Sequence, residues 1–167
     1  EELEYLELYN RGAAAIDLSN MRFSEGIDYQ FPAGAQLGPG ARLVLAGHAG
    51  YFTARYGFAP FAQYDKDLSN AGERLLLVNA FGATVLDVTY SDSGRWPAEA
   101  DGHGPSLVLL DGDPNNPDSW RASTLLGGSP GAPDPLPVVI NEVQFDPAAG
   151  RIAQIELYNP GGEDADV

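Results

Sequence analysis

The sequence predicts an all-β protein, a β-sandwich with one short helix, from three observations. Short apolar or alternating runs recur along all 167 residues, as expected for strands of about five residues. Twenty glycines and thirteen prolines are spread between these runs and supply tight turns. Helical spacing of apolar side chains occurs in one short stretch, and the 44% of apolar residues is enough for a core.

The strands follow from period and turn signals, taken in chain order. Residues 4–9 alternate as a half-buried strand does, and the turn residues Asn10 to Gly12 end them. The nearly continuous apolar run 42–46 predicts a central strand with both faces buried. Two runs around a Gly-containing loop predict a hairpin of 75–78 with 84–90. The remaining expected strands are 21–23, 27–31, 106–110, 138–145 and 152–158.

The helix is predicted at residues 50–56. Phe52, Arg55 and Tyr56 have the i, i+3, i+4 spacing of one amphipathic helix face, and Gly57 is placed to end the helix. It belongs to an aromatic-rich segment that runs to Tyr64. We expect this helix to dock across one end of the sandwich and to form a binding patch where its aromatic side chains are exposed.

The end of the chain repeats its beginning, which predicts a modular organisation. LELYNRG at residues 6–12 returns 149 residues later as IELYNPG at residues 155–161. Between the copies, Ser129 to Pro137 carries four prolines and is typical of a linker. We therefore expect a sandwich module over 1–131, a linker over 132–137 and the opening hairpin of a second module over 138–167.

An ordered set of motifs resembles the lamin-tail domain family across nearly the whole chain. The motifs, in order, are LELYN (6–10), DLS (17–19), FPAG (31–34), LGPG (37–40), LSNAGE (68–73), VLDVTY (85–90), WP (96–97), DGHGPSL (101–107), Trp120 with AS (122–123), GGSPG (127–131) and VINEV (139–143). The resemblance implies an immunoglobulin-like β-sandwich. Bacterial members are more similar to this chain than nuclear lamins are. The resemblance therefore also implies an accessory module of a secreted or surface protein, of the kind often found beside hydrolases or CotH-like kinase domains.

One departure from the family pattern predicts an open sheet edge. In the family, an Ile-Asn-Glu strand precedes Glu-Leu-Tyr-Asn, but the first module starts at Glu1 without it. A missing strand leaves unpaired backbone groups that attract another strand. We expect Val138 to Phe145 to fill the position, either in its own chain or by swapping into a strand-swapped homo-oligomer.

Charge and composition exclude several functions. Nine basic against 24 acidic residues give a net charge of −15, which repels phosphate backbones and disfavours nucleic-acid binding. The absence of cysteine excludes disulfides and thiolate chemistry. No apolar run approaches the roughly 20 residues of a membrane span, so we expect no membrane insertion.

The weak metal candidates are Asp111, Asp113 and Asn115. They match the first, third and fifth positions of a calcium loop, but Asn116 replaces the glycine of position six and Ala122 the glutamate of position twelve. An EF-hand is therefore rejected, and the preferred interpretation is a turn stabilised by its own side chains. A looser Ca²⁺ site stays open as an alternative, while our expectation is that the chain has no cofactor.

No catalytic constellation is evident. Four carboxylates could act as general acids or bases, but their sequence spacing does not fix the distances between them. They are Asp87, Asp92, Glu99 and Asp101. His48 and His103 are the only histidines, and neither has the motif context of a triad or the spacing of zinc ligands. They are expected in exposed loops.

Trp96 and Trp120 could stack on sugars, but we expect them to pack in the core of the sandwich.

The sequence thus predicts a non-enzymatic interaction, adhesion or spacer module of an extracellular or cell-surface protein, with a protein or cell-surface polymer as partner. The alternative is a calcium- or carbohydrate-binding accessory module attached to a hydrolase or a CotH-like domain. A third hypothesis, a hydrolase that uses Asp87, Asp92 or Asp101, is disfavoured.

Overall fold

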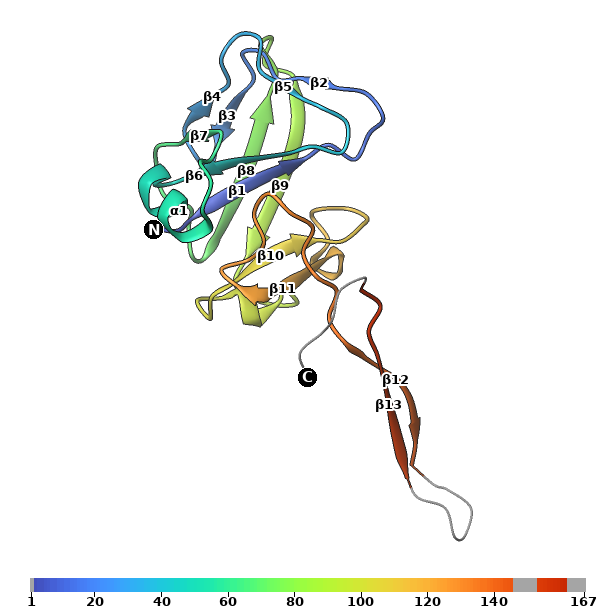
Figure 1. The fold of residues 1–167 in the computed structure, drawn as a ribbon. Helices are drawn as coiled ribbons and strands as arrows, with labels where there is room; N and C mark the ends of the chain where they lie inside the picture. The colour runs from blue at the N-terminus through green and yellow to red at the C-terminus, as the bar shows by residue number, and fades with distance from the viewer. Residues whose placement is uncertain (1, 146–152, 162–167) are drawn as a thin grey trace. The chain divides into compact units, whose positions relative to one another are not determined.

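The computed structural model describes residues 2–145 and 153–161 and is drawn in Figure 1. It divides into two compact units, Glu1–Pro133 and Asp134–Val167. The boundary lies inside the segment expected as a linker, and residues 133–138 have no regular secondary structure.

The first unit contains two main sheets. A four-stranded sheet has the order β4-β3-β8-β9, and a three-stranded sheet has the order β1-β6-β7. All pairs in these sheets are antiparallel except β6 with β7, which is parallel. Their strands are β1 Tyr5–Tyr9, β3 Arg22–Glu25, β4 Tyr29–Gln30, β6 Arg42–Ala46, β7 Ala62–Gln63, β8 Gly72–Val78 and β9 Thr84–Ser91.

The core fills the space between these sheets. Phe23 and Leu77 come from the four-stranded sheet, and Leu43 and Leu45 come from β6. All four side chains are buried in one cluster. Burial of large apolar side chains on the facing sides of two sheets is the arrangement of a β-sandwich, as predicted.

β6 is central and buried on both faces, as predicted. Its outward residues Val44 and Ala46 pack against Phe52 of the helix α1, Ala49–Tyr56. The helix ends at Gly57, which adopts the left-handed conformation at φ 78°. Our expectation that α1 docks across an end of the sandwich is wrong, because it covers the outer face of the β1–β6 pair.

Smaller elements complete the first unit. The predicted strand near 106–110 is β10 Pro105–Leu109, and it pairs with β11 Trp120–Leu126. The strands β2, β5, β7 and β11 were not predicted, because three of them have two residues and β11 mixes polar and apolar positions. The other elements are β2 Ile16–Asp17, β5 Gln36–Leu37, and the 3-10 turns η1 Ala98–Ala100 and η2 Pro117–Ser119.

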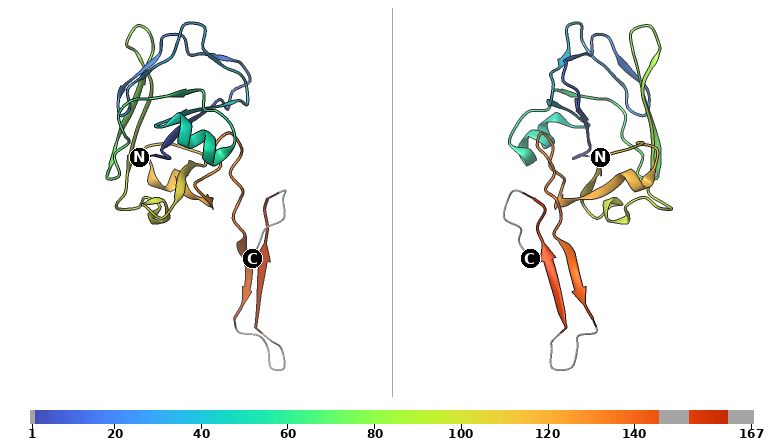
Figure 2. Two further views of the ribbon diagram at one scale, coloured as in Figure 1. Left: turned by 60° about the vertical axis from the view of Figure 1, so that its left-hand side comes forward. Right: turned by 90° about the vertical axis from the view of Figure 1, so that its right-hand side faces the viewer.

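The second unit is a hairpin of β12 Val139–Gln144 and β13 Gln154–Tyr158 (Figure 2). Both strands lie where the sequence predicts them, and every residue of both is exposed. Residues 146–152, which include the start of the strand expected from 152, lie outside the described residues. A two-stranded hairpin is marginally stable in water, because it buries little apolar surface.

Candidate functional site

The acidic loop after β10 uses its side chains to hold the loop together. Asp113 Oδ1 accepts from the Asn115 amide at 2.9 Å. Asn115 bridges to β9, since its Oδ1 accepts from Thr89 N at 2.8 Å and its Nδ2 donates to the Asp87 carbonyl at 2.9 Å. Asp111 pairs with Arg11 at 2.9 Å. One oxygen of each of these three side chains therefore takes part in a bond within the chain, and calcium binding stays a prediction to be tested.

Asp87, a candidate acid, is an ion-pair partner on the surface of the four-stranded sheet. Its two oxygens accept from Arg74 Nε and Nη2, both at 2.7 Å, and Arg74 Nη1 reaches Glu25 at 2.9 Å. The side-chain hydrogen bonds from Arg74, with its positive charge, lower the pKa of Asp87. A carboxylate with a lowered pKa and a committed partner is a poor general acid or base near neutral pH.

The remaining acidic candidates do not assemble into a site. Asp92, Glu99 and Asp101 are all exposed. Within residues 2–145 and 153–161, no group of three or more His, Asp or Glu side chains is placed to hold a metal ion.

The two histidines lie in exposed positions, as the sequence predicts. His48 caps α1: its Nδ1 accepts from Tyr51 N at 3.5 Å, and its ring lies 4.3 Å from the Tyr51 ring. His103 lines a shallow hollow beside Glu99 and Pro105. His48 therefore has a structural role in starting the helix, which its place before the helix could have suggested.

The tryptophans pack on each other, outside the main core. The Trp96 and Trp120 rings lie 5.8 Å apart, both are half-buried, and Trp120 Nε1 donates to the Pro114 carbonyl at 2.8 Å. The prediction of core packing is thus corrected to a separate aromatic pair. This pair fixes the loop around Pro114 rather than presenting a flat platform.

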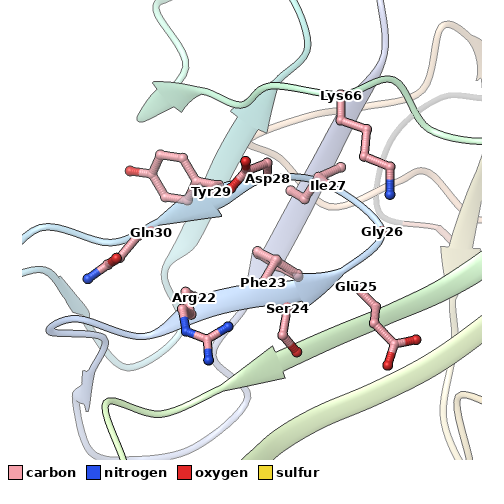
Figure 3. A pocket seen from close by; sticks show the side chains of 10 residues that line it. All are labelled: Arg22, Phe23, Ser24, Glu25, Gly26, Ile27, Asp28, Tyr29, Gln30 and Lys66. Atoms are coloured by element: carbon pink, nitrogen blue, oxygen red, sulfur yellow. The ribbon is translucent and has the colours of Figure 1, made fainter. Parts of the chain in front are cut away.

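A hollow of about 360 Å³ lies at the β3–β4 hairpin, and sequence reasoning missed it (Figure 3). Arg22 and Lys66 bring positive charge to it, and Glu25 and Asp28 bring negative charge. Two backbone bonds between Asp28 and Asp65, of 2.8 and 3.0 Å, bring the loop with Lys66 to the hairpin. Because the hollow is formed by residues almost 40 positions apart, no local sequence motif indicates it. The lining is polar and mixed in charge, which suits a surface contact.

Exposed aromatic side chains lie on and around α1. Tyr51, Phe58 and Phe61 are exposed by 46%, 38% and 48%. Phe52 from the same segment is fully buried and anchors the helix. Aromatic side chains with one face anchored and one face exposed are typical of protein interaction surfaces. We refer to Tyr51, Phe58 and Phe61 as the aromatic patch.

The comparisons with known proteins give one family. The model of the lamin tail domain matches residues 1–92. No curated protein and no solved structure matches the chain. Within the described residues, no helix is long and apolar enough to cross a membrane.

Proposed function

The chain belongs to the lamin tail domain family, and we propose that it is a non-catalytic interaction or spacer module of a larger secreted or surface protein. The family's fold is immunoglobulin-like, which agrees with several β-sheets and one short helix. The location in a secreted or surface protein rests on the resemblance to bacterial members of the family.

One observation carries this proposal: several of the polar side chains that could perform chemistry are committed to structural bonds. Asp87 is held by Arg74, Asn115 joins two segments of backbone, and His48 caps a helix. The aromatic patch, by contrast, leaves a large part of its side chains exposed to solvent. A rigid sheet body with an exposed aromatic patch suits binding, because the scaffold positions the patch at little entropic cost.

The experiment that tests the proposal measures binding of the full chain to purified cell-surface polymers and to surface proteins of the producing cell. The variant Tyr51→Ala/Phe61→Ala removes two exposed rings of the patch, and Phe81→Ala, at an exposed loop, is the matched control. We expect at least fivefold weaker binding for the first variant and unchanged binding for the control. Equal binding by both variants, with both folded, would reject the patch as the binding surface.

The enzymatic alternative has its own test. The changes Asp87→Ala, Asp92→Ala and Asp101→Ala in the parent protein should leave any activity unaltered. Loss of turnover in one of them, with the fold retained, would reject the non-catalytic proposal.

The calcium- or carbohydrate-binding alternative is favoured by the acidic surface, which attracts divalent cations. Calorimetric titration of the chain with Ca²⁺ should give no binding heat if the acidic loop is only a braced turn. A glycan array tests the carbohydrate alternative, and binding of the chain to no glycan would reject it.

A further inference from the structure

The hollow at the β3–β4 hairpin gathers polar side chains that have no partner within the chain. Arg22 and Gln30 line one end, where β3 and β4 pair, and Asp28 and Lys66 line the other end, near the turn (Figure 3). Within residues 2–145 and 153–161, none of these four side chains makes a hydrogen bond or an ion pair. Their polar groups are therefore free to bind a ligand that displaces water.

Two unpaired cations beside one hollow are unusual in this chain, because its other described arginines are all engaged. Each of them donates to a carboxylate or to a backbone carbonyl, and they are Arg11, Arg42, Arg55, Arg74, Arg95 and Arg121. With 24 acidic residues against nine basic ones, a cation on this surface readily finds an anionic partner. Arg22 and Lys66 thus distinguish this hollow from the rest of the described surface.

Lys66 is held in a conformation that its residue type disfavours. It is the only lysine of the chain, and its φ of 70° lies in the left-handed region, where a glycine would fit without strain. The two backbone bonds between Asp28 and Asp65 fix the residue before it. Strained residues are common at functional sites, and here the strained residue directs its amine at the turn of the hairpin (Figure 3).

The hairpin that carries the hollow is well supported, so a ligand would bind without having to order it. β3 pairs with β4 on one side and with β8 on the other. The half-buried Tyr29 ring packs edge-on against the buried Phe31, with ring centroids 5.0 Å apart. Tyr29 thus brings a fixed aromatic ring to a volume of about 360 Å³, which is within the range of small-molecule sites.

The distribution of hydrogen-bond donors and acceptors indicates the class of ligand. Arg22 and Lys66 only donate, an ionised Asp28 only accepts, and the Gln30 amide does both. Each end of the hollow therefore offers a donor and an acceptor, from Arg22 with Gln30 and from Lys66 with Asp28. A hydroxyl group donates and accepts at once, so a ligand with several hydroxyls satisfies both ends.

Ligands of other classes fit less well. Asp28 and the aspartates on both sides of Lys66 repel an anion, and Arg22 and Lys66 repel a cation. The ammonium group of a zwitterion would meet Lys66 at the end that carries the carboxylates. An apolar ligand gains little, because the apolar lining residues Phe23 and Ile27 are already buried.

We propose that this hollow is a binding site for a neutral carbohydrate. Arg22, Gln30, Asp28 and Lys66 supply its hydrogen bonds, and the Tyr29 ring supplies an apolar contact. Arg22 lies about 10 Å from the turn by strand spacing, so an oligosaccharide, rather than a single sugar, reaches both ends. The hollow shares no residue with the aromatic patch, so this site goes beyond the interaction function proposed for that patch.

The test titrates neutral oligosaccharides into the isotope-labelled full chain and follows its backbone amide signals by nuclear magnetic resonance. The probes are β-linked tetramers of glucose, mannose and N-acetylglucosamine and α-linked tetramers of glucose and mannose. We expect at least one tetramer to shift the signals of residues 22–30 and 66. No shift with any tetramer would overturn the proposal, and so would shifts there with acetate or glycylglycine alone.

The variant Lys66→Gly separates binding from folding. It removes the amine and relieves the left-handed backbone, so it should be at least as stable as the unsubstituted chain and bind the tetramer at least fivefold more weakly. Asn20→Gly is the matched control, because Asn20 also has a left-handed φ, of 58°, and lies outside the hollow. The control should bind as the unsubstituted chain does. Equal binding by the two variants would overturn the site.

A second pair of variants tests the other end of the hollow. Arg22→Ala should weaken binding at least fivefold, while Arg95→Ala, at an exposed arginine outside the hollow, should leave it unchanged. Shifts confined to residues 48–61 would instead place the carbohydrate on α1 and overturn the hollow as its site. The variant Tyr51→Ala/Phe61→Ala reports on the aromatic patch alone, so a failure of this proposal is distinguishable from a failure of the proposed function.

Discussion

At the residue scale, the buried Tyr64 and the half-buried Tyr90 show how one hydroxyl can weaken the fold and another can support it. The Tyr64 side chain is 2% exposed, and its hydroxyl has no hydrogen-bond partner among the described residues. Burial, with the nearby negative charge of Glu4, raises the pKa of that hydroxyl. The Tyr90 hydroxyl donates to the Ser69 carbonyl at 2.8 Å. A buried polar group without a partner costs free energy that a partnered one recovers.

The first prediction compares these hydroxyls. Tyr64→Phe removes the uncompensated group and should raise the free energy of unfolding by about 1 kcal/mol. Tyr90→Phe leaves the Ser69 carbonyl without its donor and should lower it by about 1 kcal/mol. Urea unfolding followed by circular dichroism measures both. A loss of stability in Tyr64→Phe equal to that in Tyr90→Phe would contradict the assignment of Tyr64.

Single residues also show where sequence reasoning stops. The turn character of Asp113 and Asn115 followed from their residue types, but the bonds of Asn115 to Thr89 and Asp87 span 26 and 28 positions. Such bonds depend on where β9 and the loop meet, which local sequence does not encode. For the same reason, the pairing of Trp96 with Trp120 was expected as core packing and proved to be a separate contact.

At the element scale, the β8–β9 pair depends on one glycine. Gly72 has φ +97°, and a Cβ there would lie 2.4 Å from the Tyr90 carbonyl oxygen. Gly82, in the loop of the same hairpin, has φ +83° with open space around it. A side chain at Gly72 therefore adds a backbone clash to the conformational cost that both positions share.

The second prediction compares substitutions at Gly72 and Gly82. Gly82→Ala should lower the free energy of unfolding by about 1 kcal/mol, the cost of a positive φ for an L-residue. Gly72→Ala should cost clearly more, because β8 and β9 must also move apart. Thermal unfolding of both variants measures the difference. Equal losses of unfolding free energy in the two variants would mean that the backbone near Tyr90 moves aside at no energetic cost.

Elements whose apolar residues follow a helix or strand period were predictable from the sequence. Elements that exist only because a neighbouring strand pairs with them were not. β1, β6, β9 and α1 were found near the expected residues, because each has an apolar pattern of its own. β2, β5 and β7 have two residues each, too few for a period, and exist because a partner strand lies beside them. The face that α1 covers follows from the apolar residues Val44 and Ala46 on the outer side of β6, and which side is the outer one becomes known only with the sheet.

At the scale of the whole molecule, the repeat organises the chain. β1 and β13 are equivalent strands in two different compact units, and each is followed by the same asparagine turn. The sequence repeat therefore places one similar strand in each unit, and a second module over 138–167 stays a prediction.

The net charge of −15 is the other property of the whole molecule, and it carries the last prediction. Like charges destabilise a compact state by repulsion, and salt screens them over about 10 Å at 0.1 M. Raising NaCl from 20 to 500 mM should therefore raise the melting temperature by about 2 to 5 °C. Differential scanning fluorimetry measures this shift.

CaCl₂ at matched ionic strength separates screening from binding. If the acidic side chains act only as a charged surface, the two salts should give nearly equal shifts at the same ionic strength. A clearly larger shift with calcium would instead reveal a specific cation site, because a ligand that binds only the folded state stabilises it. The variant Asp113→Asn would then locate the site, since it removes charge from the acidic loop while an oxygen remains to accept the bond from Asn115.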